Sequence, residues 1–132
     1  MINLERFKKQ RDIIVHSLQP CIQTILFNKD SIPKTLPCAI VILDTEDGIK
    51  GTSRQFTSTD IAWTVYLIVN AQNVEDPDLA IYALKEKFRE TYLNLANRDI
   101  PHIEYYTSRI DGTRLVRIAK LDLLKSGSGA AS

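Results

Sequence analysis

The stretch that decides the fold is IEYYTSRIDGTRLVRIAKLDLL, residues 103–124. Apolar and polar side chains alternate along it, and the Asp111–Gly112 pair stands near its middle. Alternation around an Asp-Gly pair predicts a β-hairpin closed by a two-residue turn. That turn places Arg109 directly opposite Arg114, and opposed like charges destabilise a strand pair. We therefore expect an acidic partner or a phosphate outside the fold. Alternatively, both guanidiniums splay into solvent, or a bulge shifts the register so that they never meet.

Both faces of this predicted hairpin carry cations and aromatic side chains. They belong to Tyr105, Tyr106, Arg109, Arg114, Arg117 and Lys120. A hairpin that is half exposed to water normally has one apolar face and one polar face. Tyrosine also supplies amphipathic area of the kind that protein interfaces use. The pattern indicates that the second face of the sheet packs on another subunit.

Composition fits one globular domain. The chain has 132 residues, of which 44% are hydrophobic and 25% charged. We expect the domain to span residues 1–125, with a flexible Ser/Gly/Ala tail at 126–132. Lys and Arg total 17 against 16 Asp and Glu, a balance that disfavours a protein devoted to binding nucleic acid. No run approaches the ~18 apolar residues of a membrane helix, and the start lacks a signal-peptide pattern, so we expect no membrane partner.

Helical periodicity appears twice. Apolar residues recur at helical spacing from Leu4 to about Leu26, with a kink or break expected at Pro20. A second helix should begin at Asp76 as N-cap, with Pro77 in the first helical position. Its predicted core stripe is Ile81, Leu84, Phe88, Tyr92 and Leu95. Its predicted solvated face is Lys85, Glu86, Lys87, Arg89 and Glu90.

Two further segments read as strands. Residues 38–44 form a short β-branched run, and residues 57–71 form the longest strand candidate. The polar segment between them, 46–56, contains two glycines and predicts a long loop. The order helix, strand, strand, helix, strand, strand predicts an α+β fold, with an antiparallel sheet of about four strands and two main helices on one face.

The sequence contains no convergent set of catalytic or ligand groups. His16 and His102 have no second His, Cys or carboxylate at ligand spacing, and the glycine loop after the first strand opens no helix. The acids at 44–47 lack calcium-loop spacing and read as a solvated turn. Cys21 and Cys38 read as buried apolar groups in a reducing compartment. We therefore expect no catalytic activity, cofactor or metal.

The order and lengths of these elements resemble the tail terminator and tail-completion proteins of long-tailed bacteriophages. The resemblance covers roughly residues 4–124, from "LPCAIVIL" through a polar loop, "TDIAWTVYLIVNA" and "DPDLAIYALKEKFRETYL" to the closing hairpin. It rests on element order, length and the P-x-x-x-V start of the first strand.

The resemblance implies a structural protein of the virion. In that family, a small α+β subunit forms a homohexameric ring that caps the tail tube and offers a docking surface to the head connector. The implied partners are other copies of the chain, tail tube protein and head–tail connector proteins, with DNA passing through the lumen as cargo. The implied location is the tail or neck of the virion, after assembly in the bacterial cytoplasm.

The resemblance also suggests contact residues. Lys50 and Arg54, in the long loop, are candidates for ordering on assembly. Arg109, Arg114 and Arg117 are candidates for contacts between subunits or along the lumen, and Tyr105 adds interface area.

Other functions remain open at this stage. A head–tail connector or neck protein of related fold fits the same pattern. A small enzyme or ligand-binding α+β domain would use the open sheet face around Asp60, Tyr66, Tyr105 and Arg117. Nucleic-acid binding through the basic hairpin is disfavoured by the net charge of +1.

Overall fold

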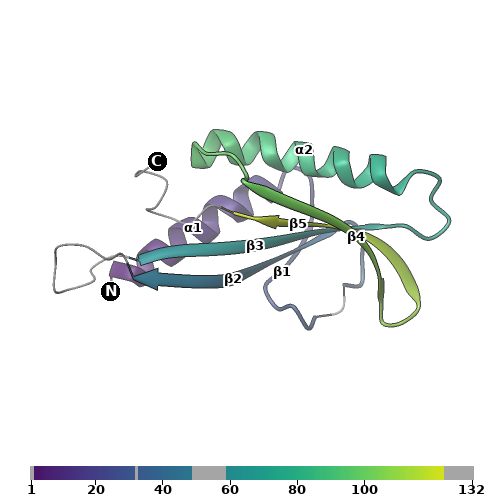
Figure 1. The fold of residues 1–132 in the computed structure, drawn as a ribbon, viewed down its shortest axis with the longest axis horizontal. Helices are drawn as coiled ribbons and strands as arrows, with labels where there is room; N and C mark the ends of the chain where they lie inside the picture. Colours follow the sequence, from purple (N-terminus) through teal and green to yellow (C-terminus); the bar gives the residue numbers. More distant parts are fainter. Residues whose placement is uncertain (1, 32, 49–58, 124–132) are drawn as a thin grey trace.

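A computed structural model describes residues 2–31, 33–48 and 59–123. Two helices and five strands follow one another along the chain (Figure 1). They are α1 (Ile2–Leu18), β1 (Thr24–Leu26), β2 (Cys38–Gly48), β3 (Thr59–Asn70), α2 (Pro77–Ala96), β4 (His102–Ile110) and β5 (Arg114–Asp122). The expected α+β class is confirmed, whereas the predicted tail at 126–132 lies outside the described residues.

The five strands form one sheet in the order β1-β2-β3-β5-β4. Every neighbouring pair is antiparallel except β1 and β2, which are parallel. The expectation of about four antiparallel strands is therefore wrong in its detail, because the sheet is mixed and has a fifth strand. The extra strand is only three residues long, too short to leave a periodic signal in the sequence.

The first helix ends where the proline predicts a break. Its last residue is Leu18, and after Pro20 the amides of Cys21 and Ile22 both donate hydrogen bonds to the Leu18 carbonyl oxygen. Pro20 ends the helical repeat because it offers no amide hydrogen and its ring clashes with the preceding turn. The chain after it turns into β1 instead of resuming the helix.

The second helix begins as predicted but buries a different set of side chains. The Asp76 carboxylate accepts a hydrogen bond from the Leu79 amide, which confirms the N-cap. Leu95, expected in the core stripe, is 49% exposed, and Lys85, expected in solvent, is only 4% exposed. Lys85 lies on the sheet side of the helix, where its ammonium approaches the Tyr82 ring. The aromatic ring and the neighbouring Glu86 carboxylate compensate for its burial.

The hairpin turn is longer than predicted. Ile110 pairs with Arg114, so three residues, 111–113, connect the strands, and both Asp111 and Gly112 have positive φ. Arg109 lies opposite Leu115. The opposition of Arg109 and Arg114 is therefore wrong, and the alternative of a shifted register is confirmed. The extra residue shifts the register by one and places the two arginines on opposite faces of the hairpin.

The β2–β3 hairpin is also longer than expected. β2 continues to Gly48 across a register shift between Leu43 and Thr45. The acids at 44–47 therefore belong to a strand and not to a solvated turn, and the expected loop at 46–56 loses its first residues to that strand. These residues form a strand because they pair with β3. Their polar composition alone does not indicate a strand.

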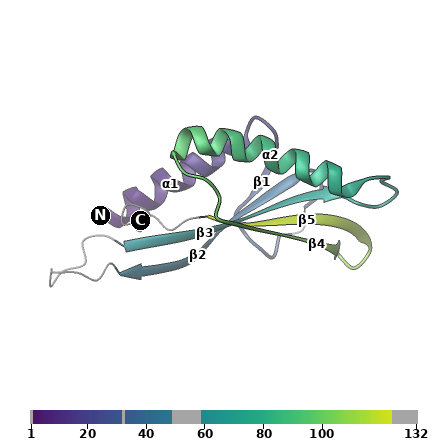
Figure 2. The same ribbon diagram turned by 45° about the horizontal axis from the view of Figure 1, so that its top comes forward.

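The two faces of the sheet are covered unequally. Both helices pack on one face, which we call the helix face, and the described residues of the segment 27–37 pass across part of the other, which we call the open face (Figure 2). Among the described residues, the cluster under the helices has eighteen buried members, whereas the cluster on the open face has five. Those five are Cys38, Ile40, Ile68, Val116 and Ile118. Most of the hydrophobic stabilisation therefore lies on the helix face.

Candidate interaction surface on the β4–β5 hairpin

One side of the β4–β5 hairpin belongs to the helix face and is tied to α2. Tyr105 of β4 and Tyr82 of α2 stack with ring centroids 6.4 Å apart and an interplanar angle of 28°. The Lys85 ammonium lies 3.6 Å from the centroid of the Tyr82 ring. Tyr105 remains about one third exposed, so it forms part of the surface while it anchors the strand.

Arg117 connects three elements on the same side. Its Nε donates to the Asp78 carboxylate at 2.8 Å, and its Nη1 donates to the Thr107 hydroxyl at 2.9 Å. Asp78 lies in the first turn of α2, and Thr107 lies directly across from Arg117 on β4. The Arg117 guanidinium therefore links the start of α2 to both strands of the hairpin.

The other two hairpin arginines also have partners within the chain. Arg114 donates from Nη2 to the Pro33 carbonyl oxygen at 2.7 Å, which ties the segment 27–37 to the hairpin. Arg109 donates to the Thr113 carbonyl oxygen at 3.3 Å, within its own turn. Arg109 is exposed, and this contact does not tie it to another element of the fold.

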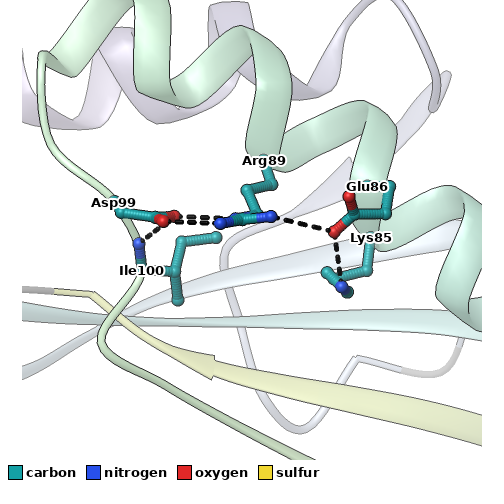
Figure 3. Close-up of polar contacts among 5 residues, drawn as sticks. All are labelled: Lys85, Glu86, Arg89, Asp99 and Ile100. Carbon is teal, nitrogen blue, oxygen red and sulfur yellow. Dashed lines mark hydrogen bonds and ion pairs between the residues drawn. The ribbon is translucent and has the colours of Figure 1, made fainter.

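A chain of ionic contacts leads from α2 to the start of β4 (Figure 3). The Glu86 carboxylate accepts from Lys85 and from Arg89, and Arg89 in turn makes a two-fold contact with Asp99 at 2.8 and 2.7 Å. The Asp99 carboxylate also accepts from the Ile100 amide at 2.7 Å. The Arg89 guanidinium and this amide lower the pKa of Asp99 from 3.8 to about 2.

The other side of the hairpin belongs to the open face and carries a polar corner. Strand pairing places the side chains there in rows. One row is Ile42, Thr64, Asp122 and His102, and the next is Ile40, Tyr66, Lys120 and Glu104. His102 Nε2 and the Glu104 carboxylate are 2.9 Å apart. This hydrogen bond and the nearby Lys120 ammonium lower the pKa of Glu104.

The register groups residues that the sequence keeps apart. His102 and Asp122 stand twenty positions apart along the chain but face each other across the hairpin. Neither histidine was expected to have a carboxylate at ligand spacing, so the group of His102, Glu104 and Asp122 was not predicted. The His-x-Glu spacing on a predicted strand was the available signal, since residues two apart share a face.

The strand β4 is the outer edge of the sheet. Among the described residues no strand pairs with its far side. Seven of its nine residues are exposed and none is buried, whereas β5 beside it has four buried residues. Long exposed edges invite pairing with another chain, and most proteins shorten or cover them.

The candidate ligand site of the alternative function does not assemble. Tyr105 and Arg117 lie on the helix face, where they contact α2, whereas Tyr66 lies on the open face with Lys29 6.0 Å from its ring. Asp60 is the second residue of β3, opposite Asp47. A cavity of about 180 Å³ lies elsewhere, and it is lined among others by Gln10, Trp63, Tyr92 and Leu95. Tyr66 is therefore separated from Tyr105 and Arg117 by the sheet itself.

Neither described cysteine is an activated thiol. Cys38 is buried and burial raises its pKa to about 11, while the half-buried Cys21 also has a raised pKa from burial. Both are free thiols. Lys50 and Arg54, the remaining interface candidates, lie outside the described residues.

Comparison with models of protein families and with curated proteins finds no match to the chain. None of the helices in the described part of the chain is long and apolar enough to cross a membrane.

Proposed function

We propose that this chain is a structural assembly protein, a tail terminator that caps a phage tail tube as a homohexameric ring and presents a surface for head joining. The observation that carries the proposal is the edge strand β4, which is nine residues long, unburied throughout and unpaired on its outer side within the described residues. The order and lengths of the elements, which resemble that family, supply the specific role.

Exposed aromatic and aliphatic side chains beside this edge support an interface. Leu79 and Tyr82 on α2 and Tyr105 and Tyr106 on β4 are all more than one third exposed. Tyr82 and Tyr105 stack on each other, so this surface is held in place before any partner binds. Tyrosine at a rigid surface is typical of interface centres.

A ring requires two different surfaces on each subunit. The β4 edge stands at one end of the sheet, and the short β1 edge stands at the other. Contacts between unlike surfaces that close on themselves produce cyclic oligomers. In the ring we place the β4 edge of one subunit against the β1 end of the next, and we assign Arg109, at the exposed hairpin tip, to a neighbouring subunit or to the lumen.

Solution mass tests the proposal. Light scattering over a concentration series, alone and then with tail tube protein from the same genome, should show a hexamer either free or on the tube. Many weak interfaces form only at high local concentration, so the templated sample is essential. A strict monomer in both samples would contradict the proposal.

A related position in the virion makes a different prediction. A neck or connector protein of similar fold would bind portal or adaptor protein, whereas a terminator binds the end of the tube. Pull-down with each purified partner separates the two, and retention by the tube alone supports the terminator.

A further inference from the structure

Three metal-ligating side chains converge at the corner of the open face where β4 begins and β5 ends. They are His102, Glu104 and Asp122, each of which offers a ligand atom within 4.8 Å of the other two. They come from two hydrogen-bonded strands, with His102 paired to Asp122 and Glu104 two residues along the same face. The backbone of the hairpin therefore fixes the spacing of all three side chains.

We propose that His102, Glu104 and Asp122 bind a divalent transition-metal ion, best represented by Zn²⁺. The proposal goes beyond the assembly function and does not depend on it. One imidazole nitrogen and two carboxylate oxygens form a mixed donor set that suits Zn²⁺ and its neighbours better than Mg²⁺ or Ca²⁺.

The distances suit such an ion after a small closure. Ligand bonds of about 2.1 Å put neighbouring donors of a tetrahedral zinc roughly 3.4 Å apart. The His102–Glu104 pair, at 2.9 Å, is already this close, and Asp122 lies within 4.8 Å of both. His102 and Glu104 are exposed, so a side-chain rotation completes the approach without moving the strands.

Binding would replace the present hydrogen bond. His102 Nε2 would give up its hydrogen-bonding role toward Glu104 and donate its lone pair to the metal, with Glu104 and Asp122 as charged oxygen ligands. Water would occupy the fourth position, because three protein ligands leave it open. The ion would then clip the start of the edge strand β4 to the end of β5.

One neighbouring cation opposes the ion. Lys120 lies directly across from Glu104 and two residues before Asp122 on the same face. Its positive charge lowers the affinity for a dication at this corner, and removing it strengthens binding. Replacing Lys120 is therefore expected to raise the affinity for the metal ion. A cluster with a purely structural role would show no such gain in metal affinity.

Isothermal titration of the full, tag-free chain with Zn²⁺ tests the site. We expect one Zn²⁺ per chain, with no comparable binding of Mg²⁺. His102→Ala and Asp122→Asn should each weaken Zn²⁺ binding by at least about tenfold, in line with the loss of a ligand or its close support. Lys120→Ala should tighten it by roughly threefold or more.

The other histidine provides the matched control. His16 on α1 is also exposed, and its Nδ1 is hydrogen-bonded to the Asp12 carbonyl oxygen. His16→Ala should leave Zn²⁺ binding unchanged, and circular dichroism should show all four variants folded. Absence of Zn²⁺ binding up to millimolar concentration would overturn the proposal. Binding that survives His102→Ala would overturn it as well.

Discussion

The helix face and the open face belong to the same five strands, but they differ in how many side chains they bury. In the described part of the chain, helices α1 and α2 cover the helix face, where eighteen residues are buried, and the segment 27–37 crosses the open face, where five are buried. The β4–β5 hairpin takes part in both, since alternate residues point to opposite faces. The comparison teaches that stability is concentrated on one face, whereas the other face and the β4 edge are available for contacts.

The largest expected effect compares two core positions on one strand. Leu121 is buried on the helix face and Ile118 on the open face, both on β5. Leu121→Ala should lower the free energy of unfolding by about 3–5 kcal/mol, and Ile118→Ala by about 2–3 kcal/mol. The loss at Ile118 is smaller because the segment 27–37, which alone covers that side in the described structure, can move more easily into the cavity than the two helices can. Urea denaturation of both variants measures the difference. Equal losses would remove the distinction between the two faces.

The next effect separates the hairpin arginines. Arg117, whose side chain is 23% exposed, donates to both Asp78 and Thr107, whereas Arg109 donates to the Thr113 carbonyl oxygen of its own turn. Arg117→Met should cost about 1–2 kcal/mol of folding free energy and Arg109→Met less than about 0.5 kcal/mol. Thermal or urea unfolding compares them. A larger loss of unfolding free energy for Arg109→Met than for Arg117→Met would show that Arg117 does not hold the hairpin against α2.

A comparable but more local effect concerns the cover of the open face. Arg114 holds the segment 27–37 through the Pro33 carbonyl oxygen. Arg114→Ala should cost about 1 kcal/mol and speed hydrogen exchange in that segment more than in α1. Mass-resolved exchange on the wild type and the variant measures this. Unchanged exchange in the segment would show that its apolar contacts alone hold it.

The smallest expected effect is the loss of unfolding free energy at low pH that protonation of Asp99 causes. Asp99 has its pKa lowered from 3.8 to about 2 by Arg89 and the Ile100 amide. Its contribution is therefore complete above about pH 4 and is lost as the pH falls toward 2. Its side chain is 45% exposed, so we expect only a few tenths of a kcal/mol.

Asp99→Asn tests this contribution. The variant should lose less stability than the wild type between pH 4 and pH 2, as followed by urea unfolding at each pH. Glu90→Gln, on the exposed side of α2, is the control and should follow the wild type. Parallel curves for Asp99→Asn and the wild type would show that the ion pair with Arg89 contributes nothing measurable.

Local signals in the sequence predicted the fold class and most elements. The Asp76 cap, the break near Pro20 and the hairpin around Gly112 follow from residue chemistry acting within a few positions. Features that depend on tertiary contacts were not predicted. The burial of Lys85 needs the Tyr82 ring, and β1 needs β2 beside it.

The candidate surface was predictable only in part. The sequence predicted that both faces of the hairpin carry cations and aromatic side chains. The three-residue turn, however, puts Arg109 and Arg114 on opposite faces and not opposite each other. A one-residue change in register moves every side chain to the other face, and turn length is the weakest point of a sequence-based prediction. The His102–Asp122 pairing depends on the same register, so the sequence alone did not reveal it.

The most direct test of the account is hydrogen exchange of the chain alone and in the presence of tail tube protein. The account predicts that amides of β4, residues 102–110, exchange more slowly on assembly, because their free edge becomes covered, while amides of α1 change little. Unchanged exchange in β4 together with new protection on α1 would contradict it. That result would place the interface on the helices, away from the sheet edge.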